Sequence, residues 1–157
     1  MIDSGITIRE LSIEDSVPLA HMLSTDAELN KRLGNVEAHV SVGHFFNRTR
    51  ESCRVKNAVP YAVVTADRRV IGLVILGHAD ETDRTARVAF WIESGSWGQA
   101  FCAGLLSPVL DVAKGKGVER LVGKVDKDDV PGRRIWEANG GRVADETEEG
   151  YAYEIRL

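Results

Sequence analysis

Residues 97–106 read Trp-Gly-Gln-Ala-Phe-Cys-Ala-Gly-Leu-Leu, and this stretch decides the fold of the chain. It follows an apolar strand candidate at residues 88–92 and leads into a helical pattern of apolar residues that continues to Val112. The first turn of a helix leaves backbone N–H groups without partners, and the helix dipole adds partial positive charge there. Small side chains would let a phosphate approach these N–H groups. The stretch therefore indicates an anion-binding turn, and a closely packed strand–helix junction is the alternative interpretation.

The composition is typical of a folded globular protein. The 157 residues, 43% hydrophobic and 28% charged, suit a single domain over residues 1–157 with its own hydrophobic core. The net charge of -4 argues against non-specific binding to nucleic acid. No apolar run is long enough to cross a membrane, and residues 1–5 lack the features of a secretion signal. We therefore expect a cytoplasmic protein without a nucleic-acid or membrane partner.

Neither the cysteines nor the histidines indicate a metal site. Cys53 and Cys102 lie far apart and form no paired motif, so we interpret them as reduced thiols. His21, His39 and His44 show no ligand spacing, and the last two do not share a helical face. We therefore predict no bound metal.

The periodicity of apolar residues predicts a series of strands and helices. Strands are expected at residues 6–11, 61–65, 70–76, 85–92, 121–125, 142–144 and 151–155, and helices at residues 12–27, 39–54, 98–114 and 129–139. The strand at 70–76 is apolar on both faces, which places it centrally in the sheet. This order predicts an α/β fold with a mixed sheet, helices on both faces, and one parallel crossover through the helix after Gly98. Pro108 falls inside that helix, where an interior proline costs about 3 kcal/mol.

Four segments together resemble the GNAT superfamily of acyl-CoA-dependent N-acetyltransferases. Residues 8–15 are similar to the opening strand and first helix of the branch that includes the ribosomal-protein N-terminal acetyltransferases. Residues 86–92 resemble the fourth strand of that branch, and residues 95–102 resemble its pyrophosphate-binding turn. Residues 135–140, Ile-Trp-Glu-Ala-Asn-Gly, resemble the end of its later coenzyme motif. The resemblance covers nearly the whole chain and implies a GNAT-like fold with a mostly antiparallel sheet.

The resemblance also implies that the chain binds acetyl-CoA, or another acyl-CoA, and transfers the acyl group to a primary amine. Backbone N–H groups of the turn would hold the coenzyme pyrophosphate. The residues concerned are Trp97, Gly98, Gln99, Ala100, Phe101, Cys102, Ala103 and Gly104. The main chain of Phe90, Trp91 and Ile92 would meet the pantetheine amides, with their side chains serving the core. Asp129 and Arg133 could contact the coenzyme, or serve only as a helix cap and a solvated side chain.

Two side chains are candidates for removing a proton from the acceptor amine. Glu93 follows the fourth strand, and His78 has an imidazole suited to proton transfer, although both could be ordinary surface residues. An ordered water is the third option. Cys102 could form a covalent intermediate, whereas the resemblance implies direct attack by the amine. Trp136 stands where many members carry a proton-donating tyrosine, and Arg87 stands where some carry a glutamate base.

Departures from the family pattern support a second interpretation. Ala100 replaces a glycine, Cys102 replaces a glycine or alanine, and Asp129 replaces a common asparagine. A methyl group at position 100 is tolerated only where φ is negative. Together with Trp136 and Arg87, these residues favour a non-catalytic GNAT-like domain that binds a ligand or a protein. A third option keeps the fold but uses another acyl thioester.

The acceptor would lie against the first two helices and the C-terminal hairpin, which vary most in this fold. An acidic chain suits a cationic acceptor such as a polyamine, an aminoglycoside-like metabolite or a basic peptide N-terminus. A homodimer is also possible, since the exposed strands of this fold can pair between two copies.

Overall fold

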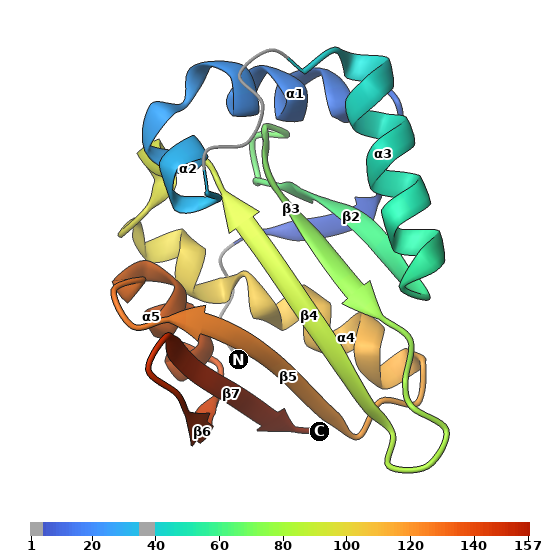
Figure 1. Ribbon diagram of the computed structural model, residues 1–157, viewed down its shortest axis with the longest axis vertical. Helices are drawn as coiled ribbons and strands as arrows, with labels where there is room; N and C mark the ends of the chain where they lie inside the picture. The colour runs from blue at the N-terminus through green and yellow to red at the C-terminus, as the bar shows by residue number, and fades with distance from the viewer. Residues whose placement is uncertain (1–4, 35–39) are drawn as a thin grey trace.

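A seven-stranded mixed sheet forms the centre of the structure, a computed structural model that describes residues 5–34 and 40–157 (Figure 1). In chain order the strands are β1 (Thr7–Glu10), β2 (Ala58–Val64), β3 (Val70–Gly77), β4 (Thr85–Ile92), β5 (Arg120–Asp126), β6 (Arg142–Glu146) and β7 (Gly150–Arg156). They lie in the order β1-β2-β3-β4-β5-β7-β6, with β4 and β5 parallel and the other neighbours antiparallel. The predicted mixed, mostly antiparallel sheet, the central place of β3 and the parallel crossover are confirmed.

Helices cover both faces of this sheet (Figure 1). They are α1 (Ser16–Thr25), α2 (Ala27–Arg32), α3 (Val42–Val55), α4 (Leu106–Gly115) and α5 (Val130–Ala138), with the short 3-10 helices η1 (Ser94–Ser96) and η2 (Ala100–Gly104) before α4. On one face Leu19 of α1 and Phe45 of α3 pack against Leu73 of β3. On the other face α4 and α5 cover the larger core. Within residues 5–34 and 40–157, no helix is long and apolar enough to cross a membrane.

The predicted helix at residues 12–27 is divided in two. Ser12 accepts the N–H of Asp15 in a turn before α1, which begins only at Ser16. Asp26 then leaves the helical conformation, with φ -90° and ψ 91°, and caps α2 by accepting the N–H of Leu29. The predicted helix at 39–54 begins at Val42, and His39 lies outside the described residues.

The predicted helix at residues 98–114 was wrong in its first half. Residues Ala100–Gly104 form the 3-10 helix η2, and the α-helix begins at Leu106. Pro108 therefore lies in the first turn of α4, where the missing N–H has no intrahelical partner to lose. The expected cost of an interior proline does not arise, because the α-helix begins only two residues before Pro108.

β4 and β5 diverge along their length (Figure 1). Their ladder ends at the pair Arg87 and Val122, although the strands continue to Ile92 and Asp126. The sheet is therefore open between the carboxyl ends of its two parallel strands, which is the place where α/β sheets commonly bind ligands.

Candidate active site

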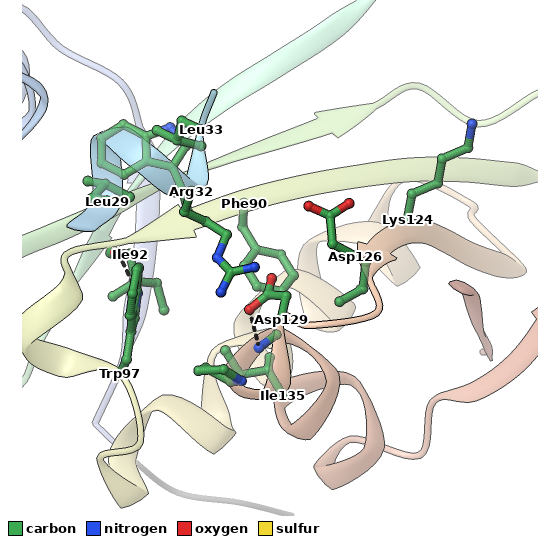
Figure 2. Close-up of a pocket in the computed structure, with 14 residues that line it drawn as sticks. Leu29, Arg32, Leu33, Phe90, Ile92, Trp97, Lys124, Asp126, Asp129 and Ile135 are labelled. Carbon is green, nitrogen blue, oxygen red and sulfur yellow. Dashed lines mark hydrogen bonds between the residues drawn. The ribbon is translucent and has the colours of Figure 1, made fainter. Parts of the chain in front are cut away.

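The divergence of β4 and β5 opens a cleft of about 230 Å³, whose other walls come from α2 and the start of α5 (Figure 2). Its lining residues are Leu29, Arg32, Leu33, Phe90, Trp91, Ile92, Trp97, Lys124, Val125, Asp126, Asp129, Pro131, Gly132 and Ile135. Phe90, Trp91 and Ile92, which the sequence assigned to the coenzyme, all lie on this cleft.

The main chain of Phe90 faces the cleft. A Cβ atom added at Gly123 of β5 would lie 2.8 Å from the carbonyl oxygen of Val88, so this carbonyl points toward β5. Main-chain direction repeats every second residue in a strand, so the N–H and C=O groups of Phe90 point the same way. The β4–β5 ladder ends before Phe90, which leaves these polar groups directed into the opening.

Gly98 and the first two residues of η2 present further unpaired donors. Gly98 has a φ of 77°, a conformation that glycine adopts without strain. Within the described parts of the chain, the N–H groups of Gly98, Ala100 and Phe101 donate to no protein acceptor. Ala100 is not among the residues with positive φ, so its methyl group is compatible with the turn. The free N–H groups of Ala100 and Phe101 are adjacent, and adjacent free N–H groups in a turn can form a concavity for an anion.

Three hydrogen bonds hold this turn in place. The indole Nε1 of Trp97 donates to the carbonyl oxygen of Ile92 at 2.9 Å. The Cys102 thiol donates to the carbonyl oxygen of Ser96 at 3.1 Å. The side-chain amide of Asn139, at the end of α5, donates to the carbonyl oxygen of Ala103 at 2.6 Å. The turn is therefore fixed to β4 and to α5.

A hollow of about 170 Å³ adjoins the turn. It is lined by Ile92, Trp97, Gly98, Gln99, Ala100, Cys102, Ala103, Pro131, Arg134 and Ile135. Of the remaining predicted turn residues, Gly104 is buried and Phe101 packs against the core. Arg134 lines the same hollow as Gly98 and Ala100, and its guanidinium is of a kind that pairs strongly with phosphate.

The sequence indicated Arg133 as a possible coenzyme contact and did not single out Arg134, the arginine that lines this hollow. Arg133 instead lies over the ring of Tyr151, 4.7 Å from its centre, and its Nε donates to the hydroxyl of Tyr153 at 3.4 Å. It points toward β7 and away from the cleft. Pro131 and Arg134 are three residues apart on α5, so they share a helical face and line the same hollow.

Asp129 lies at the start of α5, as the sequence predicted, and it acts as the helix cap. Its Oδ1 accepts the N–H of Gly132 at 3.1 Å and so caps α5, while the residue also lines the cleft. The cleft also contains three charged residues that sequence reasoning did not assign, Arg32, Lys124 and Asp126. No local pattern marks them, because α2 and β5 meet only in the folded chain.

The structure argues against Cys102 as a nucleophile. Burial, together with the negative charge of Glu93, raises the pKa of the Cys102 thiol to about 11. The thiol is therefore protonated at neutral pH, and it is already engaged with Ser96. Cys102 is a small buried residue that braces the turn.

Neither candidate base, Glu93 or His78, lies on the cleft. The carboxylate of Glu93 pairs with Arg69 at 3.1 Å and faces a separate cavity beside α1. His78 follows β3 at the opposite end of the sheet, where its Nδ1 lies 2.7 Å from the carbonyl oxygen of Asn57. It is six residues beyond Gly72, the partner of Ile92, which corresponds to about 20 Å along the strand.

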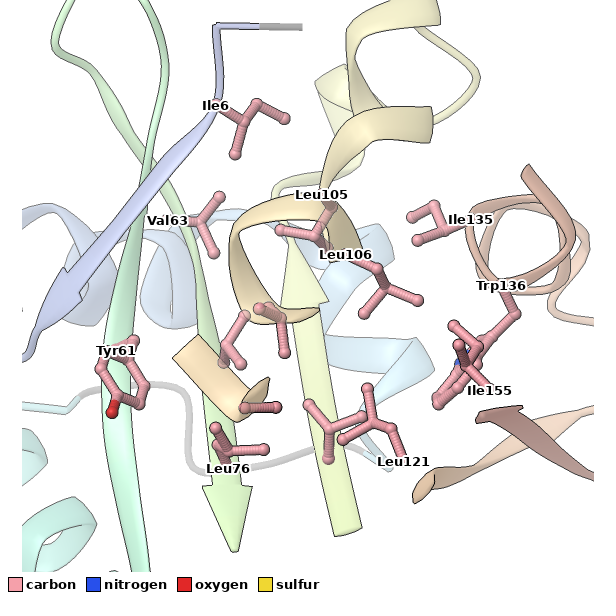
Figure 3. Close-up of a cluster of buried hydrophobic side chains, with 14 of the residues drawn as sticks. Ile6, Tyr61, Val63, Leu76, Leu105, Leu106, Leu121, Ile135, Trp136 and Ile155 are labelled. Atoms are coloured by element: carbon pink, nitrogen blue, oxygen red, sulfur yellow. The ribbon is translucent and has the colours of Figure 1, made fainter. Parts of the chain in front are cut away.

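Trp136 belongs to the core (Figure 3). Its side chain is buried, stacks on Tyr153 with ring centres 5.9 Å apart, and lies against Gly123. Trp136 does not line the cleft, so it does not occupy the position of a proton donor there. Arg87 is exposed and lies where the β4–β5 ladder ends.

Comparisons with known proteins agree with this geometry. The family described as "Acetyltransferase (GNAT) domain" matches residues 6–142. The chain therefore belongs to the GNAT acetyltransferase family, and the predicted family is confirmed. No curated protein sequence matches the chain.

Solved structures with the same fold include three that were determined with coenzyme A or a derivative of it. Aminoglycoside acetyltransferase AAC(6')-Ib with coenzyme A has a TM-score of 0.79 at 12% identity, covering 96% of this chain and 94% of its own. Spermidine N-acetyltransferase from Vibrio cholerae, with CoA and spermine, has a TM-score of 0.77 at 16% identity, covering 98% and 96%. Mycobacterium smegmatis RimJ with CoA-disulfide has a TM-score of 0.76 at 15% identity, covering 98% and 83%. At these identities the similarity establishes the GNAT fold.

Proposed function

We propose that this chain is an N-acetyltransferase that moves an acetyl group from acetyl-CoA to a primary amine of a small molecule or a peptide N-terminus. The observation that carries this proposal is the set of unpaired N–H groups at Gly98, Ala100 and Phe101, beside Arg134 and next to the open end of β4. Donors in this arrangement suit the diphosphate of a coenzyme. The solved structures of this fold with coenzyme A support the same ligand.

Bound acetyl-CoA supplies a thioester whose carbonyl carbon an amine can attack. The N–H of Phe90 points into the cleft and is available to donate to the oxyanion that develops during this attack. Phe90, Trp97 and Ile135 give the cleft apolar walls, which limit competing attack by water. The main chain of β4 and the apolar walls thus favour acyl transfer in this cleft.

Asp126 is the carboxylate best placed to orient the amine and accept its proton. Asp126 and Asp129 are the carboxylates on the cleft within the described residues, and Asp129 is engaged as the cap of α5. Asp126 ends β5 and lies on both the cleft and a neighbouring cavity. No tyrosine or cysteine lines the described cleft, so the leaving thiolate takes its proton from solvent.

The acceptor approaches through that neighbouring cavity, which has a volume of about 500 Å³. Its charged lining residues are Lys124, Asp126, Asp145, Glu148 and Glu149, from β5 and the β6–β7 hairpin. Four carboxylates against one ammonium favour a cationic acceptor. Structural neighbours determined with spermine or with aminoglycosides such as kanamycin support an amine of this kind.

The test is release of free thiol from acetyl-CoA in the presence of amines of graded charge. Spermine, an aminoglycoside, a basic peptide and a neutral primary amine form the panel. We expect thiol release that depends on the amine and is faster with the cationic members. Acetyl-CoA binding without amine-dependent release from any member would contradict the proposal.

That contradicting result is the one expected of the second candidate function, a GNAT-like domain that binds acyl-CoA without turnover. The burial of Trp136, and the lack of a tyrosine on the described cleft, are the observations that favour it. A binding domain would hold the coenzyme through the same turn and release no thiol.

A further inference from the structure

Helix α2 contacts the diphosphate-binding turn and the segment before it from both of its ends. At its start, Asp26 Oδ2 accepts the Ser94 N–H at 2.7 Å, and Asp26 Oδ1 accepts the Ser94 hydroxyl at 2.6 Å. At its end, the Arg32 guanidinium lies 5.9 Å from the ring centre of Trp97 and pairs with Asp128 at 3.0 Å. These contacts join segments that are far apart in the sequence.

Ser94 transmits the position of Asp26 to the turn. The carbonyl oxygen of Ser94 accepts the N–H of Trp97 at 3.1 Å, and the carbonyl oxygen of Ser96 accepts the N–H of Gln99 at 3.1 Å. Gly98, the first of the free donors, lies between these two fixed residues. A shift of Ser94 would therefore move the N–H groups that face the diphosphate.

Asp26 is suited to this task because it stays ionised. Burial acts to raise the pKa of its carboxyl group, but the hydrogen bonds from Ser94 and from the start of α2 bring the pKa below its ordinary value. Hydrogen bonds to an ionised acceptor are stronger than those between neutral groups. The same carboxylate also accepts the N–H of Leu29, so one side chain orients both α2 and the turn.

We propose that Asp26 is a positioning residue which, through Ser94, holds the turn of residues 97–104 in its ligand-binding shape. This inference rests on the proposed function, since it takes the turn to be the coenzyme site. Leu29 and Arg32 of the same helix line the cleft, so Asp26 also couples the wall of the cleft to the coenzyme turn.

The experiment compares coenzyme A binding by calorimetry in the wild type, Asp26→Asn, Ser94→Ala and the double variant. In Asp26→Asn, the amide nitrogen would face the N–H of either Ser94 or Leu29, and we expect affinity to fall about tenfold. Ser94→Ala removes only the hydroxyl and should cost about threefold. Both substitutions weaken the same Asp26–Ser94 hydrogen bonds, so Ser94→Ala should have little further effect on affinity in the Asp26→Asn background. Glu28→Gln, at an exposed position of the same helix, is the matched charge control.

Two further readouts separate positioning from general loss of structure. Amide hydrogen exchange of residues 97–104 should accelerate in Asp26→Asn but not in Glu28→Gln, and the KM for acetyl-CoA should rise while kcat is kept. Unchanged affinity in a folded Asp26→Asn protein, or additive effects in the double variant, would overturn the inference. If Asp26→Asn does not fold, unchanged coenzyme A affinity in Ser94→Ala would likewise overturn the inference. Absence of coenzyme binding in the wild type would overturn the proposed function itself.

Discussion

The indole of Trp97 joins the turn of residues 97–104, the proposed diphosphate site, to the open end of β4, because its Nε1 donates a 2.9 Å hydrogen bond to the carbonyl oxygen of Ile92. This carbonyl has no strand partner on the β5 side, since the ladder has already ended. The two parts of the proposed coenzyme site are thus connected by one side chain, which also forms a wall of the cleft.

Replacement of Trp97 by phenylalanine tests this connection. The ring is kept in part, but the hydrogen bond to Ile92 is lost. We expect a loss of about 1 kcal/mol in coenzyme A binding, equivalent to roughly fivefold in Kd. Calorimetric titration of both proteins gives the comparison, with thermal unfolding as the check on folding. An unchanged Kd would show that the link is dispensable.

Gly123 is predicted to be indispensable for packing. A Cβ atom there would lie 2.4 Å from the Trp136 ring and 2.8 Å from the carbonyl oxygen of Val88. Gly123→Ala should therefore lower the free energy of unfolding by about 2 kcal/mol, which corresponds to roughly 4–8 °C in Tm. Gly43→Ala is the matched control, because an added methyl group at Gly43 meets no atom within 4 Å. Equal Tm values for the two variants would show that the indole and the β4 backbone at Val88 can both move to accept the methyl group.

Cys102 should resist alkylation in the native protein. Its thiol is buried and has its pKa raised to about 11, so the reactive thiolate is scarce below that pH. Intact mass after iodoacetamide treatment at pH 8 should show no adduct, whereas the denatured chain should take two, at Cys53 and Cys102. Because a raised thiol pKa favours the folded state only while the thiol is protonated, this contribution fades as the pH rises from about 9 towards 11. Rapid native labelling of Cys102 would contradict its structural role.

Asp126→Asn should reduce kcat for amine acetylation by about 100-fold, because the carboxylate that accepts the amine proton is replaced by a neutral amide. Coenzyme A affinity should be unchanged. Asp145→Asn is the control from the neighbouring cavity, and it should raise the KM of cationic acceptors while keeping kcat. A kcat equal to that of the wild type in Asp126→Asn would assign proton removal elsewhere, with an ordered water as the remaining option.

The fold was largely predictable because its signals are local. Alternating or continuous apolar residues marked most strands, and β4 was predicted with its observed ends, Thr85 and Ile92. The start of α4 was mispredicted because apolar spacing is similar in 3-10 and α-helices, and Pro108 was taken as an interior residue. Asn139, which binds the carbonyl oxygen of Ala103, comes from another helix and gave no local signal.

The proposed site was predictable only in the parts that are formed by continuous segments of the sequence. Residues 90–92 and the turn after Trp97 are each a short continuous segment, so the resemblance to the family could indicate them as the proposed coenzyme site. Arg32 and Asp126 reach the cleft from α2 and β5, and their proximity depends on tertiary packing. Glu93 and His78 were chosen for their chemistry, and the structure places both away from the cleft.

The most direct test of the coenzyme site is a calorimetric titration with coenzyme A of the wild type, Ala100→Gly and Ala100→Asp. Ala100 lies among the free N–H groups, so a carboxylate there would repel a diphosphate, whereas glycine keeps the donors open. We predict micromolar binding by the wild type and by Ala100→Gly, and a loss of at least about 100-fold in Ala100→Asp. No binding by the wild type up to millimolar coenzyme A, or equal binding by all three proteins, would contradict the account.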